Sequence, residues 1–207
     1  GQSFYQRKEV KDVLAYLRLL INNKDIEAFK RVINHPKRGI GDASVQKIIA
    51  EAETQKLSPL AILDFLKQGG KAQTSMAGFA QMIRQWKEKT DTLNAYEIAK
   101  MVALQSGLIE YYASDHSLEG VSRTENINQL LDSIKEFVDN DEDLEAGNTP
   151  DKTLSTYLQT IALYTDFDQE NSENDFITLM SVHAAKGLGY RSIFLVGMEE
   201  NLFPSFM

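Results

Sequence analysis

Residues 122–138, SRTENINQLLDSIKEFV, carry the pattern that decides the fold class. Ser122 and Glu125 have the spacing of a capping box at the start of a helix. The apolar side chains that follow recur every three or four positions, as on the buried face of a helix: Ile127, Leu130, Leu131, Ile134, Phe137 and Val138. The stretch therefore predicts a long amphipathic helix that begins near Ser122.

The same spacing recurs through most of the chain. It predicts further helices over residues 10–21, 26–33, 45–52, 76–86, 98–103 and 154–161. Pro36 disfavours helical geometry in the residue before it, so the second of these helices should stop just ahead of it. Ser58 and Pro59 supply a cap and a first-turn proline for one more helix, which should end at Gly69-Gly70.

Both ends of the chain differ from this helical middle. Phe4 and Tyr5 are predicted to form a short strand, and residues 176–182 and 192–196 are short apolar runs typical of strands buried in a parallel sheet. The polar, acidic residues 165–175 indicate a domain boundary. We therefore predict a mainly α chain, in which a helical middle is inserted into an incomplete α/β domain.

The charge is unevenly distributed. Twenty-two basic and 30 acidic residues give a net charge of -8, which argues against nucleic-acid binding over the whole surface. Residues 30–47, however, hold five basic residues against one acidic residue, a local charge of 5 - 1 = +4. Any DNA contact should therefore be local. The acidic run at 139–145 is interpreted as a solvated loop, because Leu144 stands where a calcium loop needs glycine.

Composition excludes several classes of protein. The chain has no cysteine, and His35, His116 and His183 are too scattered for a familiar ligand spacing, so no metal site is expected. No apolar run approaches the roughly 20 residues that cross a bilayer, and the N-terminus lacks a secretory pattern. We expect a cytoplasmic protein without a membrane partner.

Residues 36–41, PKRGIG, form the first candidate site, between two predicted helices. Gly39 and Gly41 flank Ile40 and allow a tight turn, which leaves amide N–H groups at the start of the next helix free to hold a phosphate. Lys37 and Arg38 add positive charge, so the segment could position a DNA duplex without reading its bases. A glycine-rich turn with solvated cations is the alternative that composition leaves open.

Residues 177–188, ITLMSVHAAKGL, form the second candidate site, a predicted strand that runs into a turn of small residues. Groups at the carboxyl end of such a strand face the crevice where α/β proteins bind ligands. Ser181 could hydrogen-bond a phosphate, His183 could do so or stack on a base, and Lys186 could add positive charge. A polar turn without a ligand is again the alternative.

The sequence lacks the signatures of a self-sufficient enzyme. It has no phosphate loop of the form Gly-x-x-x-x-Gly-Lys-Ser/Thr and no acidic pair after a strand to hold magnesium. It also has no Gly-x-Ser-x-Gly elbow. We expect no ATPase or unwinding activity from this chain alone.

Several segments together resemble one family, the UvrD/PcrA/Rep-like superfamily 1A DNA helicases. SVHAAKGL at 181–188, FLVGMEE at 194–200 and LFP at 202–204 are similar to motif V and its following strand. The N-terminal stretch FYQRKEVKD, residues 4–12, resembles the segment that leads into the accessory 2B subdomain of the family. Residues 31–41 resemble the start of 2B with its duplex-contacting Gly-Ile-Gly loop.

The resemblance implies an ATP-driven enzyme that moves 3′ to 5′ along single-stranded DNA and separates the duplex ahead of it. It implies a helical 2B subdomain over residues 25–170, inserted into an incomplete RecA-like 2A domain formed by residues 1–24 and 171–207. The implied partners are duplex DNA, a 3′-tailed single strand and the remainder of the helicase motor. ATP and Mg²⁺ would serve the intact parent, since its phosphate loop and magnesium-binding acids lie outside this chain in the family order.

Site residues follow from the same resemblance. Residues Lys37 to Gly41 would touch the duplex, while Ser181, His183 and Lys186 would line the single-strand path. Gly187 and Gly189 fall in the nucleotide-binding part of motif V. Gly189 departs from the family, which usually has an acidic residue there that contacts the nucleotide sugar, and glycine cannot make that hydrogen bond.

A protein-interaction module is the main alternative. In that hypothesis the helical body and the acidic loop bind a regulatory partner, and the glycine segment is only a turn. The negative net charge favours it.

Overall fold

The computed structural model describes residues 4–65, 70–140 and 149–170. Within these ranges the chain is all helical and contains no strand. It forms a short 3-10 turn and nine α-helices: η1 (Phe4–Gln6), α1 (Lys8–Ile21), α2 (Ile26–Val32), α3 (Asp42–Gln55), α4 (Pro59–Phe65), α5 (Lys71–Lys89), α6 (Ala95–Gln105), α7 (Leu108–Ala113), α8 (Leu118–Asp139) and α10 (Leu154–Glu170).

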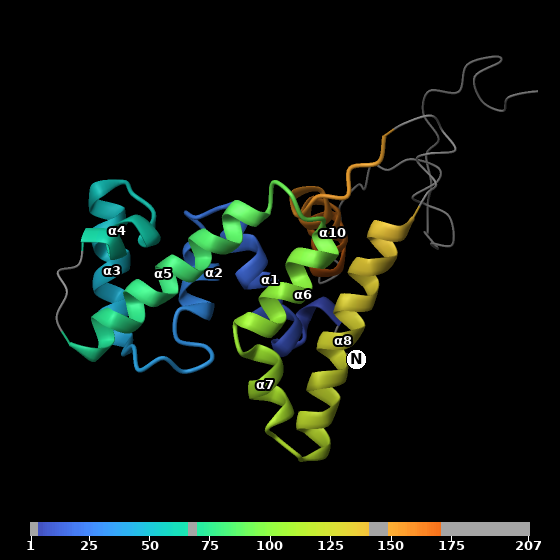
Figure 1. Ribbon diagram of the computed structural model, residues 1–207, viewed down its shortest axis with the longest axis horizontal. Coiled ribbons are helices and arrows are strands. Elements are labelled where there is room, and N and C mark those ends of the chain that lie inside the picture. The colour runs from blue at the N-terminus through green and yellow to red at the C-terminus, as the bar shows by residue number, and fades with distance from the viewer. Residues whose placement is uncertain (1–3, 66–69, 141–148, 171–207) are drawn as a thin grey trace, which may run out of the picture. The chain divides into compact units, whose positions relative to one another are not determined.

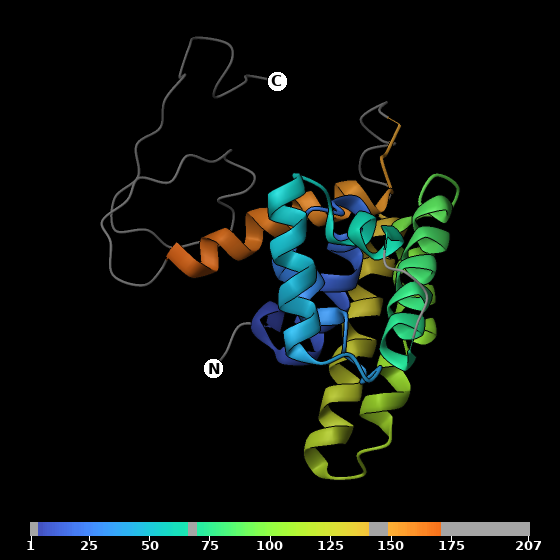
Figure 2. The same cartoon turned by 90° about the vertical axis from the view of Figure 1, so that its left-hand side faces the viewer.

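Helix α1 lies in the middle of these helices and contacts α2, α5, α6, α8 and α10 (Figure 1, Figure 2). A helix that is apolar on nearly all sides belongs in a protein core. Its side chains with at most 1% of their surface exposed are Val10, Val13, Ala15, Tyr16, Leu17, Leu19 and Leu20. The core is therefore built around α1.

Aromatic side chains join α1 to α2 and α5. The Tyr16 ring lies 6.5 Å from that of Phe79 and 6.0 Å from that of Trp86, both on α5. Phe29 of α2 meets Phe79 edge to face at 6.2 Å between ring centroids. Such pairs add about 0.5–1.5 kcal/mol beyond their buried area. These packed rings lie under the segment that joins α2 to α3, where Arg38 contacts Tyr16 and Phe79.

The helices predicted from apolar spacing are confirmed. Helix α2 ends at Val32, ahead of Pro36. Helix α4 begins at Pro59, and Ser58 caps it by accepting a hydrogen bond from the Ala61 amide at 3.2 Å. Its predicted end at Gly69-Gly70 reaches into residues outside the described ranges.

Two predictions of local structure were wrong. Phe4 and Tyr5 belong to the 3-10 turn η1 rather than to a strand, because both rings pack against the helical core. Helix α8 begins at Leu118 instead of near Ser122. Ser117 caps it by accepting from the Gly120 amide at 3.1 Å, so Ser122 already lies in the second turn.

The chain divides into two compact units, Gly1–Glu170 and Asn171–Met207. The strands predicted at 176–182 and 192–196 lie outside the described residues, as does most of the acidic run at 139–145. The division into 2A and 2B subdomains stays a prediction. In the described part of the chain, no helix combines the length and apolarity that crossing a bilayer requires.

Removing α1 should abolish the fold. A fragment of residues 25–170 lacks the central helix and exposes the apolar faces that α1 covers, so we expect no cooperative unfolding transition. Thermal unfolding followed by circular dichroism, with residues 1–170 as the control, measures this. A cooperative transition in the shorter fragment would show that the body folds without α1.

Candidate nucleic-acid interface

The segment between α2 and α3 is held in the core by one buried side chain and exposes the backbone on either side of it to solvent. Ile40 is 1% exposed and holds the segment in the core, while Lys37, Gly39 and Gly41 are exposed. Gly39 has a φ of +72°, which side chains rarely tolerate, and no atom lies within 4 Å of the position a Cβ would take. The backbone conformation therefore favours glycine at position 39, and the main chain of Gly39 is open to solvent.

The Asn34 side chain holds the turn from inside. Its Oδ1 accepts hydrogen bonds from the backbone amides of Arg38 at 2.8 Å and Ile40 at 3.2 Å. Gly41 is the N-cap of α3, a helix of 14 residues. The positive end of that helix dipole therefore lies next to the two exposed glycines and favours anions, although the exposed Asp42 in the first turn of α3 offsets part of this positive charge.

The Arg38 side chain lies beneath the loop. Its Nη1 donates to the carbonyl oxygens of Val32 at 2.9 Å and of Ile33 and Pro36 at 3.3 Å each. Its Nη2 donates to the Tyr16 hydroxyl at 2.7 Å, and the guanidinium lies 5.2 Å from the Phe79 ring centroid. Arg38 thus donates to carbonyls at and just beyond the end of α2, where helical hydrogen bonds stop.

Lys37 differs from Arg38, its neighbour in sequence. Its side chain is exposed, and no ion pair within the described ranges involves it. Lys37 therefore carries the available positive charge of the loop. The contacts of Lys37 and Arg38 with phosphate both stay predictions.

A polar network fixes the point where the loop begins. Asp12 of α1, 2% exposed, accepts from Arg31 Nε at 2.8 Å, from the Tyr112 hydroxyl, and pairs with His35 Nε2 at 2.9 Å. Burial alone would raise the pKa of Asp12, but the His35 and Tyr112 hydrogen bonds and the charges of His35 and Arg31 outweigh it and lower that pKa. Burial, and then the bond to Asp12, raise the pKa of Tyr112.

A hollow of about 650 Å³ lies between α3 and α5. Ser44 and Lys47 of α3 and Gly70 and Lys71 at the start of α5 line it. Both lysines are exposed and make no ion pair among the described residues. Glu51 of α3 also lines the hollow, so two lysines against one carboxylate leave it a net charge of 2 - 1 = +1 beside the Gly39–Gly41 turn.

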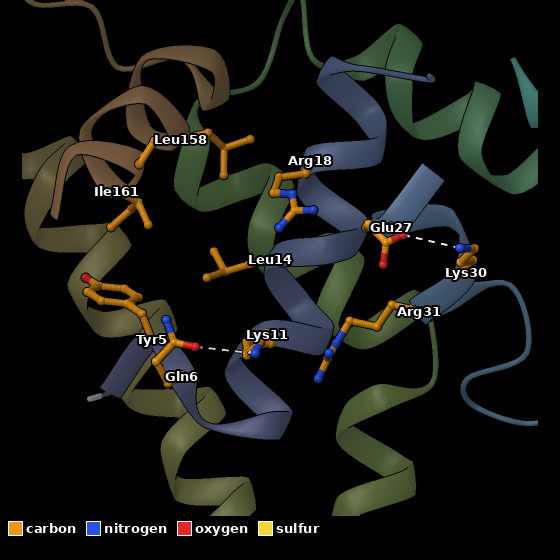
Figure 3. A pocket seen from close by; sticks show the side chains of 11 residues that line it. Tyr5, Gln6, Lys11, Leu14, Arg18, Glu27, Lys30, Arg31, Leu158 and Ile161 are labelled. Carbon is orange, nitrogen blue, oxygen red and sulfur yellow. Dashed lines mark hydrogen bonds and ion pairs between the residues drawn. The ribbon is translucent and has the colours of Figure 1, made fainter. Parts of the chain in front are cut away.

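A second groove of about 710 Å³, shown in Figure 3, is bounded by η1, α1, α2 and α10. Leu14, Leu158 and Ile161 form its apolar wall, and four basic side chains line it. Three of these cations form ion pairs, Arg18 with Asp25, Arg31 with Asp12 and Lys30 with Glu27, and Lys11 donates a hydrogen bond to Gln6. This pairing makes the groove a weaker anion site than the loop.

The second predicted site lies outside the described residues. Ser181, His183, Lys186, Gly187 and Gly189 all fall in that part of the chain. Within the described ranges, no three histidine or acidic side chains gather as they would around a metal ion.

Sequence reasoning missed the residues that support the loop, Asp12, Tyr16, Asn34 and Tyr112. One signal was present: Asp12 shares a helix face with Ala15, Tyr16 and Leu19, three, four and seven residues on, and none of these is charged. A carboxylate in such a place must have buried partners. Their identity depends on α7, 100 residues away.

The chain belongs to the UvrD-like helicase C-terminal domain family, whose model matches residues 1–207. It is 38% identical over 213 residues to the ATP-dependent DNA helicase PcrA of Bacillus subtilis (strain 168), covering 99% of this chain and 28% of that protein. It is 36% identical over 209 residues to PcrA of Staphylococcus aureus (strain Mu50), covering 99% of this chain and 27% of the relative. The chain thus spans little more than a quarter of these relatives.

Replacing Arg38 should lower stability. In Arg38→Ala the carbonyls of Ile33 and Pro36 and the Tyr16 hydroxyl lose the Arg38 donor, and the Val32 carbonyl loses one of its donors, so we expect the free energy of unfolding to fall by about 2 kcal/mol or more. Arg38→Lys should recover only part of this, because an ammonium lacks the planar fork. Urea unfolding measures both, and Lys37→Ala, the matched control, should change stability by less than about 0.5 kcal/mol. Equal effects of Arg38→Ala and Lys37→Ala would contradict the buried role.

Acid should weaken the Asp12 network. Because the pKa of Asp12 in the folded chain lies below its ordinary value of 3.8, the stabilisation by Asp12 is complete above the unfolded pKa and is lost as the pH falls through the folded pKa. The stability gap between wild type and Asp12→Asn should therefore be constant above about pH 5 and should narrow below about pH 4. Urea unfolding across this range measures the gap; a gap that does not change with pH would rule out an ionised Asp12.

Proposed function

We propose that this chain is the accessory-domain region of an ATP-dependent 3′-to-5′ DNA helicase and that its Lys37–Gly41 loop grips the duplex ahead of the motor. One observation carries the proposal: the loop turns an unpaired lysine and two open glycines to solvent and is held by buried contacts. The relatives named PcrA are ATP-dependent DNA helicases, which supports the same reading.

The loop suits a phosphate backbone for three physical reasons. Gly39 and Gly41 let a phosphate approach the main chain closely, and the start of α3 favours negative charge. Lys37 supplies a mobile ammonium, and Lys47 and Lys71 extend the positive surface along the duplex. None of these groups forms a fixed set of donors for base edges, so binding should be independent of sequence.

The rest of the motor completes the proposed activity. We assign residues 25–170 to the 2B subdomain and residues 1–24 and 171–207 to edges of the RecA-like 2A domain. Ser181, His183 and Lys186 are proposed to line the path of the single strand, and Gly187 to approach the nucleotide. ATP and Mg²⁺ would be held by parts of the parent outside this chain.

Lys37→Ala should weaken duplex binding without unfolding the chain. The loss of one phosphate contact should reduce the slope of log affinity against log salt concentration by about 1. Fluorescence anisotropy with a 3′-tailed duplex, at several salt concentrations and without ATP, measures affinity and slope. Lys89→Ala, an exposed lysine at the last turn of α5, is the control. An unchanged slope in Lys37→Ala would remove the loop from the interface.

A protein partner is the second candidate function. The first turns of α8 expose Leu118 to 92% and Val121 to 49%, and the chain is acidic. Exposed apolar side chains that lie close together favour a protein contact. No duplex binding even at low salt, together with partner capture that survives high salt, would favour this role over DNA gripping.

A further inference from the structure

The carboxylate of Asp12 ties α1 to the segment that carries the proposed duplex contact. Its Oδ1 accepts from Arg31 in the last turn of α2, and its Oδ2 faces His35 and the Tyr112 hydroxyl. Asp12 is 2% exposed, so these donors take the place of water. Asp12 therefore holds both the end of α2 and the side chain of His35, the residue before Pro36, while the Tyr16 hydroxyl holds the His35 carbonyl at 2.6 Å.

Helix α7 adds a second side to this attachment. The His35 ring meets Tyr111 edge to face at 4.8 Å and Tyr112 at 6.0 Å between centroids. A Cβ on Gly107, just before α7, would lie 3.7 Å from Pro36 Cγ. The start of the loop is thus held between α1 and α7.

We propose that Asp12 is a positioning residue for duplex binding: it touches no DNA, and it sets the place of Lys37, Gly39 and Gly41 through His35 and Arg31. The inference rests on the proposed function of the loop. It differs from the roles of Asn34 and Arg38, which shape the turn from within. Asp12 instead sets where the turn lies relative to α1 and α7.

Asp12→Asn isolates this role. Asparagine has the same size and keeps one oxygen, but its amide NH₂ must face either Arg31 or the His35–Tyr112 pair. Facing Arg31, the amide would oppose a guanidinium that can only donate; facing His35 and Tyr112, it would require the hydroxyl to turn round and the imidazole to accept, so either orientation disturbs the network. The apolar contacts of Val13 and Leu17 on the same helix are unaffected, so the helical body is retained.

Glu9 provides a matched control on the same helix. It lies one turn before Asp12, is 4% exposed, and accepts from Asn126 Nδ2 of α8 at 2.6 Å. Its hydrogen-bond partner thus belongs to α8 and not to the loop. Glu9→Gln makes the same chemical change in an equally buried carboxylate, so it reports the cost of losing a buried charge from α1 without moving the loop.

The test compares the full chain with its Asp12→Asn and Glu9→Gln variants. We expect Asp12→Asn to bind a 3′-tailed duplex about tenfold more weakly than Glu9→Gln, the order of effect that a coupled network transmits. We also expect the backbone amide NMR signals of Gly39, Ile40 and Gly41 to shift in Asp12→Asn and to stay in Glu9→Gln. Equal affinities of the two variants, or unshifted loop signals in Asp12→Asn, would overturn the positioning role.

Two further variants separate the possible failures. If Lys37→Ala weakens duplex binding and Asp12→Asn does not, the positioning role fails and the duplex contact stands. If wild type does not bind duplex, the proposed function fails, and the amide signals still decide whether Asp12 positions the loop. Should Asp12→Asn not fold in urea titrations, Tyr112→Phe takes its place, because it removes one donor and keeps the ring packing.

Discussion

The burial of α1 on nearly all sides is the constraint on which the described structure depends. Five helices contact this one, and most of its side chains are buried and apolar, while Lys8, Lys11 and Arg18 stay exposed. Glu9 and Asp12 are the buried charged residues of α1, and each carboxylate must find donors on a neighbouring helix. Those donors fix how α2, α7 and α8 lie against α1. The core and the polar network are therefore two consequences of one buried helix.

Lys37 and Arg38 show how two adjacent cations acquire different roles. The last carbonyls of α2 lack helical partners, and a planar guanidinium can satisfy several of them together. The Arg38 guanidinium makes these hydrogen bonds while it lies against the rings of Tyr16 and Phe79. Its N–H groups therefore bond within the protein instead of facing a ligand. Lys37 has no such partner and stays exposed. The charge available to a ligand is smaller than the +4 that composition indicates for residues 30–47.

Apolar periodicity was sufficient for the helices, since α2, α3 and α6 lie where their stripes predict them. It could not predict the ends that depend on a competing cap, as Ser117 rather than Ser122 shows for α8. For the loop, the sequence correctly located the exposed Gly39 and Gly41. The Arg38–Tyr16 hydrogen bond and the partners of Asp12 involve residues 19 to 100 positions apart in the chain, which local patterns do not contain.

The pairing of cations, more than their number, distinguishes the two basic regions of this acidic chain. The groove of Figure 3 has four basic side chains, but binding an anion there means breaking ion pairs or hydrogen bonds that already exist. The surface from Lys37 to Lys47 and Lys71 has fewer cations, yet each is solvated and unpaired in the described residues. A lysine that is free of protein partners can neutralise a DNA phosphate and so release the counterions condensed on the DNA, whereas a cation already paired with a carboxylate contributes little to this release. A net charge of -8 is therefore compatible with a local DNA contact.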